Sequence, residues 1–279
     1  MAPLPAPAAA PRWPWPPALR ASVGLHMAAG AALFVPGVEA WALGSVVLNH
    51  LGLTAAGLWP RSSVLGANVT RLPAASAARG AVAITIDDGP DPAVTPAVLD
   101  LLDTLGARAT FFCIAQRAAR HPALVREIVA RGHDVQNHSD GHRHDFSLSG
   151  PRKLEREIAA AQARLADITG RRPHAFRAPA GLRNPLLDPV LHRLGLHLVS
   201  WTRRGFDTRD ADPARVLARL ERGLAGGDIL LLHDGHARRT VAGRPVLLDV
   251  LPPLLARVRA AGLHTATLQA ALPTRHPTP

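Results

Sequence analysis

The sequence predicts an α/β protein in which a parallel sheet curls into a closed or nearly closed (β/α) barrel, preceded by a hydrophobic helical hairpin. Two observations carry this prediction. From residue 80 to about residue 272, short apolar runs alternate with segments of helical period. Before residue 61, two long stretches each lack charged side chains, which suits a pair of apolar helices. A chain of 279 residues is long enough for one such barrel and an appendage.

Seven short apolar segments are expected to form the strands. They span residues 81–86, 109–114, 133–138, 174–179, 196–201, 228–233 and 263–268. Between the third and the fourth, residues 151–170 repeat apolar side chains on one helical face, and Gly170 supplies the stop. Because strands and helices alternate, the sheet is expected to be parallel. Parallel barrels gather their functional side chains at the carboxyl ends of the strands.

The hydrophobic hairpin is expected to anchor the chain in a membrane. Its two stretches, Ala21–Val38 and Ala40–Pro60, each approach the ~20 residues that a helix needs to cross a bilayer. Trp41 and Trp59 bracket the second stretch, as the aromatic belts of membrane proteins do. A buried hairpin of a soluble domain, or a signal peptide followed by another apolar segment, are the alternatives.

Charge and composition predict the orientation of the hairpin in the membrane and the boundaries of the domains. Arginines flank the hairpin on both sides and none lies between residues 21 and 60, so the positive-inside rule places both ends in the cytoplasm. His26, Asn49 and His50 weaken the hydrophobicity, which leaves a single span or a re-entrant hairpin open. The expected domains are a Pro/Ala-rich disordered segment at 1–18, membrane-anchoring helices at 19–60, a linker at 61–79, the barrel at 80–272 and a tail at 273–279.

Composition argues against two further classes of protein. The formal net charge of +11 would suit a nucleic-acid partner, but Lys153 is the only lysine and the arginines form no basic block. We therefore expect no nucleic-acid partner. The single cysteine, Cys113, excludes an internal disulfide. It lies in the apolar run ATFFCI and is expected to be a buried apolar side chain rather than a nucleophile.

Polar side chains follow the ends of the predicted strands. Asp87 and Asp88 follow the first strand, His138 and His142 the third, Arg177 the fourth, and His233 and Asp234 the sixth. The two histidines at i and i+4 can face one point on a helical turn. One carboxylate and two imidazoles make a three-ligand metal site with open coordination positions. The sequence therefore predicts that one of the two adjacent aspartates binds a metal ion.

These segments resemble a known family. TIDDGP, HSDGH, RAPAG, the Asp-rich segment after SW, and LLHDG are similar to the five ordered motifs of the polysaccharide deacetylases with a NodB homology domain, carbohydrate esterase family 4. The resemblance covers about residues 80–272. It implies a distorted (β/α) barrel and a metal-dependent hydrolase that removes acetyl groups from N-acetylated sugars. The expected partners are an N-acetylated sugar polymer, oligomer or lipid-linked sugar, and a divalent ion, Zn²⁺ first, with Co²⁺, Ni²⁺ or Mn²⁺ as alternatives.

The resemblance also implies roles for the acidic and histidine residues. Asp87 would be the general base, and Asp88, His138 and His142 would be the metal ligands. Arg177 would pair with Asp87, keep it ionised and relieve the repulsion between the two acids. Since the family more often acts on glycans outside the membrane, the resemblance and the charge rule disagree about which side the barrel faces.

The remaining implied roles concern the leaving group and the substrate. His233 would protonate the leaving amine, held in its cationic form by Asp210, with Asp207 as the less favoured partner. The backbone N–H of Ala180 would stabilise the oxyanion, and Pro179 and Trp201 would contact the substrate.

Departures from the family pattern leave the substrate and two ligand positions open. Ala180 stands where the family often has an aromatic residue, and Ala211 where it has Trp, so the pocket is expected to be more open or to be completed by Trp201, Phe206 or the membrane. His144 and Asp145 are alternative metal ligands. Two other functions stay open: an inert sugar-binding module of the same fold, and a hydrolase of a different amide or ester.

Overall fold

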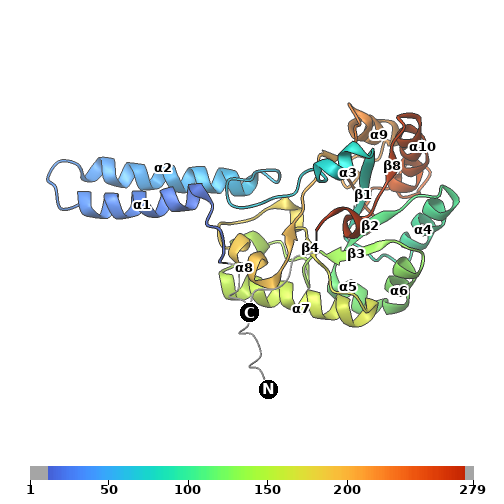
Figure 1. The fold of residues 1–279 in the computed structure, drawn as a ribbon, viewed down its shortest axis with the longest axis horizontal. Helices are drawn as coiled ribbons and strands as arrows, with labels where there is room; N and C mark the ends of the chain where they lie inside the picture. Colours follow the sequence, from blue (N-terminus) through green and yellow to red (C-terminus); the bar gives the residue numbers. More distant parts are fainter. Residues whose placement is uncertain (1–11, 274–279) are drawn as a thin grey trace, which may run out of the picture.

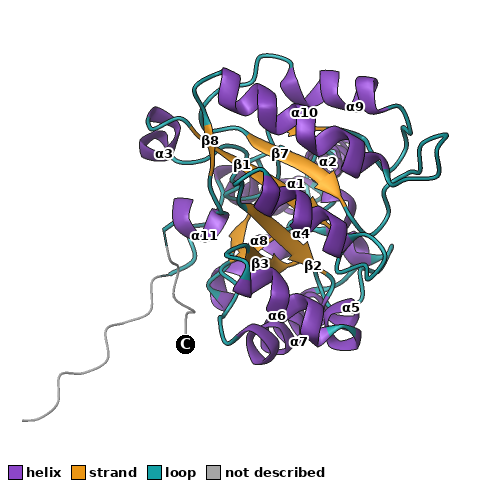
Figure 2. Ribbon diagram, turned by 90° about the vertical axis from the view of Figure 1, so that its right-hand side faces the viewer, coloured by secondary structure: helices purple, strands orange, loops and turns teal. Residues whose placement is uncertain are grey.

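The structure, a computed structural model, describes residues 12–273. Its main body is a parallel sheet in the order β5-β4-β3-β2-β1-β7-β6, with β8 paired to the start of β1 and helices packed around it (Figure 2). The strands are β1 (Ala81–Asp87), β2 (Ala109–Cys113), β3 (Asp134–Asn137), β4 (Ala175–Phe176), β5 (His197–Leu198), β6 (Arg203–Arg204), β7 (Ile229–His233) and β8 (His264–Thr265). Among the described residues no ladder joins β5 to β6, so the distorted (β/α) fold is confirmed as an open, curled sheet.

All seven predicted strand segments contain a strand, and one further strand was missed. The strand β6 pairs only with β7 and consists of two arginines, so it has no apolar run that would reveal it. By contrast, every residue of β1 is buried and β1 lies between β2 and β7. A continuous apolar, β-branched run is what a strand covered on both faces requires. The centre of the sheet was therefore easier to predict than its edges.

Helices pack around the curled sheet, most of them against one of its faces. They are α3 (Ala74–Ala78), α4 (Thr95–Thr104), α5 (Ala115–Arg120), α6 (Pro122–Ala130), α7 (Pro151–Thr169), α8 (Leu187–Leu194), α9 (Pro213–Glu221), α10 (Val246–Ala260) and α11 (Leu268–Ala271). The helix α7 matches the predicted segment 151–170, and its buried face includes Leu154, Ile158 and Leu165. Gly170 ends it in the left-handed conformation at φ 69°, where glycine carries no side-chain clash.

The hydrophobic hairpin consists of α1 (Pro17–Ala32) and α2 (Glu39–Leu58), which project together from one side of the barrel (Figure 1). The helix α2 is long and apolar enough to cross a membrane, and only 11% of its most apolar window is buried. That exposure argues against the alternative of a buried helical hairpin. The helix α1 has 16 residues and falls short of a full span. Of the two predicted spans, one is therefore supported by length and composition, and membrane insertion itself stays a prediction.

The segment 61–79 was expected to be a linker, and this prediction is wrong. Leu65 and Leu72 are buried, Val69 pairs with Val199 next to β5, and Arg71 forms an ion pair of 2.8 Å with the fully buried Asp228. A chain segment with buried side chains and a strand-like pairing is part of the domain that it contacts. The barrel is therefore attached closely to the hairpin and does not swing on a tether.

The hairpin joins the barrel at the edge where the strands end. The Ser200 hydroxyl, just after β5, donates to the Pro60 carbonyl oxygen at 2.6 Å, and the Arg183 N–H donates to the Gly57 carbonyl oxygen at 3.2 Å. The helix α1 begins at Pro17, slightly before the expected boundary at residue 19. Most of the expected disordered segment, residues 1–11, and of the tail, residues 274–279, lies outside the described residues.

Candidate metal centre and active site

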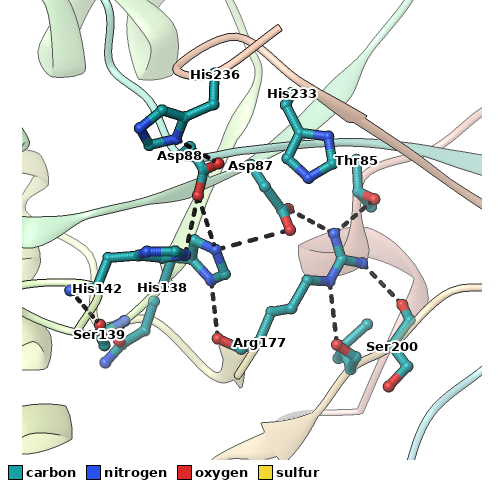
Figure 3. A network of polar contacts seen from close by, with 12 residues as sticks. Thr85, Asp87, Asp88, His138, Ser139, His142, Arg177, Ser200, His233 and His236 are labelled. Carbon is teal, nitrogen blue, oxygen red and sulfur yellow. Dashed lines mark hydrogen bonds and ion pairs between the residues drawn. The ribbon is translucent and has the colours of Figure 1, made fainter. Parts of the chain in front are cut away.

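The carboxyl ends of β1, β3, β4 and β7 bring most of the predicted site residues together at one cavity of about 230 Å³. Figure 3 shows the polar contacts among these side chains. The lining of the cavity includes Asp87, Asp88, His138, His142, Ala180, Trp201, Arg204, His233 and His236. Because β1 is flanked by β2 and β7, its two terminal aspartates lie in the middle of this edge. The position agrees with the rule that parallel α/β sheets carry their chemistry at the carboxyl ends of the strands.

Three side chains converge as a candidate metal centre. The Nε2 atoms of His138 and His142 each lie 3.2 Å from Oδ1 of Asp88, and one ligand atom from each residue falls within 4.8 Å of the others. Asp88 and His142 have positive φ angles of 75° and 50°, which residues other than glycine seldom adopt. Such costly backbone conformations are concentrated at functional sites. The His138 Nδ1 lies 2.9 Å from the Arg177 carbonyl oxygen. A donor at Nδ1 leaves the His138 Nε2 lone pair directed at the centre.

The arrangement requires a positive charge at its centre. Asp88 Oδ1 is buried and has no hydrogen-bond partner among the described residues, although two imidazole nitrogens face it. Burial, followed by the charge of His138, lowers the pKa of His142 to about 4, so that imidazole is neutral at pH 7. Burial disfavours the charged imidazole of His138, but the charges of Asp87 and Asp88 outweigh it and raise the pKa of His138. The two carboxylates therefore attract a positive charge, which a proton on His138 or a metal ion can supply. Carboxylate and imidazole are common ligands of Zn²⁺ and related divalent ions, so the donor set fits such an ion.

Asp87 is held by the most buried arginine of the site. Arg177 Nη1 donates to Asp87 Oδ1 at 2.6 Å and to the Thr85 hydroxyl at 2.8 Å, and Arg177 is 1% exposed. Its other nitrogens donate to the carbonyl oxygens of Val199 and Ser200. The guanidinium also lies over a phenylalanine ring, 4.1 Å from its centroid. The fixed cation compensates the negative charge of Asp87 beside Asp88, the pairing that the family resemblance implies.

His233 is paired with Asp207, and the predicted partner Asp210 is wrong. The His233 Nδ1 lies 2.9 Å from Asp207 Oδ1, and the His233 backbone N–H donates to Asp207 Oδ2 at 2.7 Å. Asp207 is fully buried, whereas Asp210 accepts hydrogen bonds from Arg215 and Arg219 on α9. The Asp210 carboxylate is thus already neutralised by two arginines. Burial disfavours the charged imidazole, but the charge and hydrogen bond of Asp207 outweigh it and raise the pKa of His233.

The residues expected to contact the substrate lie beside this cluster. Ala180 adopts φ 55° and ψ 5°, and within residues 12–273 its N–H donates to no acceptor. Pro179 is buried next to it, and Trp201 lines the cavity and is 7% exposed. An N–H held without a partner at the rim of a cavity can donate to a substrate oxygen.

The alternative ligands do not join the metal set. Asp145 is occupied by ion pairs with Arg143 at 2.8 Å and Lys153 at 2.9 Å. His144 lines the cavity but is not part of the group whose ligand atoms converge. Cys113 is fully buried, as predicted.

Sequence reasoning missed two basic side chains that line the cavity. His236 Nδ1 lies 2.8 Å from Asp88 Oδ2, and its Nε2 faces an Arg117 guanidinium nitrogen at 3.0 Å. Because arginine only donates, His236 Nε2 accepts and Nδ1 carries the proton given to Asp88. The available signal was the position of His236 directly after LLHDG. Arg204, the second missed residue, lies on the edge strand that was not predicted.

The geometry agrees with comparisons with known proteins. The family model described as polysaccharide deacetylase matches residues 74–199. A peptidoglycan-N-acetylglucosamine deacetylase of Bacillus cereus is 38% identical over 178 residues, covering 62% of this chain and 81% of the relative. The chain belongs to the polysaccharide deacetylase family. As a member it is a hydrolase that acts on carbon–nitrogen bonds other than peptide bonds.

Two further relatives of this polysaccharide deacetylase support the assignment. A chitooligosaccharide deacetylase of Azorhizobium caulinodans is 37% identical over 161 residues, covering 56% of this chain and 75% of the relative. The solved structure of a family 4 carbohydrate esterase from Streptomyces lividans in complex with acetate is 32% identical, with a TM-score of 0.62, and covers 72% of this chain and 98% of the other.

Proposed function

We propose that this chain hydrolyses the N-acetyl amide of an amino sugar, either in a glycan polymer or oligomer or in a lipid-linked sugar. One observation carries the proposal: a metal-ligating set, a carboxylate paired with a buried arginine, and a histidine paired with a buried aspartate line the same cavity. The relatives named as peptidoglycan and chitooligosaccharide deacetylases support amino sugars as the substrate class.

Asp88, His138 and His142 would hold the metal ion, for which we propose Zn²⁺ first and Co²⁺, Ni²⁺ or Mn²⁺ as alternatives. When bound, such an ion supplies Lewis acidity to the amide carbonyl and to water. The His138 ring is held in place by the Arg177 carbonyl oxygen, and Asp88 by His236, so two of the three ligands are oriented by hydrogen bonds.

The other polar residues would move protons and stabilise charge. Asp87, which accepts a hydrogen bond from Arg177 at 2.6 Å, would accept the proton of the attacking water. The Ala180 N–H would donate to the carbonyl oxygen as negative charge develops on it. His233, protonated and held by Asp207, would donate a proton to the leaving amine. Trp201 and Pro179 would bound the space for the sugar.

The pairing of His233 gives a prediction that separates Asp207 from Asp210. Asp207→Asn removes the charge that raises the pKa of His233, so that pKa falls. Because the acid must be protonated, the alkaline limb of the kcat–pH profile is expected to move to lower pH, with kcat reduced roughly 10²–10⁴-fold. Asp210→Asn is the matched control and should keep the profile and kcat. Equal effects of the two substitutions would contradict the assignment.

We further propose that the hairpin holds the barrel at a membrane, with the domain order given above and residues 61–79 counted with the barrel. The apolar, exposed helix α2 supports this anchoring. The arginines around the hairpin favour a cytoplasmic barrel. A fusion of alkaline phosphatase or of a fluorescent protein to the carboxyl end would report the side.

Acetate release tests the proposed activity directly. Full-length protein loaded with Zn²⁺ is incubated with N-acetylated oligosaccharides, peptidoglycan fragments and lipid-linked N-acetyl sugars, and free acetate and new amines are measured together. We expect equal amounts of the two products. Formate in place of acetate would indicate another acyl group, and no product from any amino sugar would overturn the proposal.

A further inference from the structure

A second, larger cavity lies next to the metal cavity. Its volume is about 720 Å³, within the range of small-molecule sites. It lies between the last turn of α2 and the strand edge, and it is lined by Ala55, Leu58, Trp59, Pro60, Arg61, Trp201, Thr202, Arg204 and Phe206. Trp201 and Arg204 also line the metal cavity. The two cavities therefore adjoin at these two side chains.

The second cavity is walled mainly by apolar side chains. Leu58 and Trp59 at the end of α2 are 60% and 62% exposed, and Phe206 on the opposite wall is 41% exposed. Phe206 has a φ of 60°, a conformation that is costly for a bulky residue and that is found mainly where function requires it. The apolar wall continues along α2, whose surface also exposes Leu51. An apolar chain lying in this cavity would thus leave it along the proposed membrane helix.

Positive charge lies between the two cavities. The Arg204 Cζ lies 5.4 Å from the Trp201 ring centroid and 5.2 Å from that of Phe206. Its Nε is buried and, among the described residues, has no hydrogen-bond partner. Arg61, which donates to the Thr202 carbonyl oxygen at 3.1 Å, lines the same cavity. An arginine with an unused buried donor is suited to a phosphate oxygen.

We propose that the second cavity binds the phosphate and the first part of the lipid chain of a lipid-linked substrate, an N-acetyl amino sugar joined through phosphate to a long apolar chain. This inference rests on the proposed function and narrows it. The order along the molecule is the sugar at the metal centre, the phosphate at Arg204 and the chain against Leu58, Trp59 and Phe206. A water-soluble glycan would gain no binding free energy from these apolar walls. A lipid chain can pass from the bilayer into the cavity without exposing apolar surface to water.

The test compares substrates that share the sugar and differ in the rest. Full-length protein in lipid nanodiscs is given polyprenyl-pyrophosphate-linked N-acetylglucosamine, N-acetylglucosamine 1-phosphate and a soluble N-acetylated chito-oligosaccharide. We expect kcat/KM for the lipid-linked substrate to exceed that for the oligosaccharide by about 100-fold, because its confinement to the same bilayer raises its effective concentration at the site and its phosphate contacts Arg204. The kcat/KM of the sugar 1-phosphate should lie between these two values. Its excess over the oligosaccharide measures the contribution of the phosphate.

Two leucines of α2 provide a matched pair of variants. Leu58 and Leu43 are each 60% exposed on the same helix, but only Leu58 lines the cavity. Leu58→Gln is expected to lower the ratio of the lipid-linked to the soluble kcat/KM roughly fivefold to tenfold, because one apolar contact is lost. Leu43→Gln should change this ratio less than about twofold. A wild-type ratio near one, or equal effects of the two variants, would overturn the inference while leaving the deacetylase proposal intact.

Binding gives a readout that does not depend on turnover. Polyprenyl phosphate without sugar is titrated into nanodiscs that hold the protein with Trp13, Trp15 and Trp41 replaced by Phe. The fluorescence of the remaining Trp59 and Trp201, which line the cavity, is followed. We expect saturable quenching that Leu58→Gln weakens and Leu43→Gln does not. If no substrate releases acetate, the proposed function fails, and this titration alone decides the inference: absence of saturable quenching overturns it.

Discussion

Asp87→Asn is expected to abolish turnover while the metal ion stays bound. Asn is nearly isosteric with Asp and cannot accept the proton of the attacking water, so kcat should fall roughly 10²–10⁴-fold, the usual contribution of a general base. The metal set converges on Asp88 Oδ1, and Asp87 is not part of it. Acetate release and metal content are measured on the same preparation.

Two further substitutions serve as controls for this experiment. Asp88→Asn should lower both turnover and metal content, because Asp88 carries the oxygen that faces both histidines. Asp100→Asn, at an exposed carboxylate paired with Arg131, should change neither. Near-native turnover in Asp87→Asn would transfer the role of the base to another group, with His233 as the first candidate.

The centre of the site could be predicted from sequence because its residues directly follow buried strands. Asp87, Asp88 and His138 each come at the end of a run that is apolar or covered on both faces, and the order of parallel strands brings such ends together. The roles assigned to these residues still came from the family resemblance. Spacing alone did not distinguish which aspartate binds the metal ion.

The partner of His233 could not be predicted because it depends on how the loop after β6 positions two nearby carboxylates. Asp207 and Asp210 lie three residues apart, and both are acidic. What separates them is the placement of α9, whose Arg215 and Arg219 neutralise Asp210 and leave Asp207 buried beside the imidazole. Such a choice is made by tertiary packing and leaves no local signal.

The prediction that residues 61–79 form a linker failed for a related reason. Its two buried leucines, Leu65 and Leu72, are seven positions apart, and two positions are too few to define a strand or helix period. Their burial arises because the chain runs along the strand edge, pairs at Val69 and fixes Arg71 on Asp228. This close attachment also brings the end of α2 to the active site, which a flexible linker would not do.

The metal centre itself leads to the second large expected effect. His138→Ala and His142→Ala each remove one of the three converging ligands, so metal affinity should fall by more than the ~10–100-fold that follows loss of an outer hydrogen-bond partner. Deacetylase activity should fall with occupancy and recover partly at high Zn²⁺ concentration. Metal content after dialysis and the Kd from competition with a chelator are the measurements.

His144→Ala is the matched control for this experiment. His144 lines the same cavity and lies two residues after His142, but its ring is not part of the converging set. It should therefore retain wild-type affinity for Zn²⁺. Loss of metal in His144→Ala with retention in His142→Ala would mean that the loop after β3 presents the other imidazole to the ion. Unchanged affinity in both His138→Ala and His142→Ala would remove the metal centre altogether, since Asp88 alone has too few ligand atoms to hold a divalent ion against water.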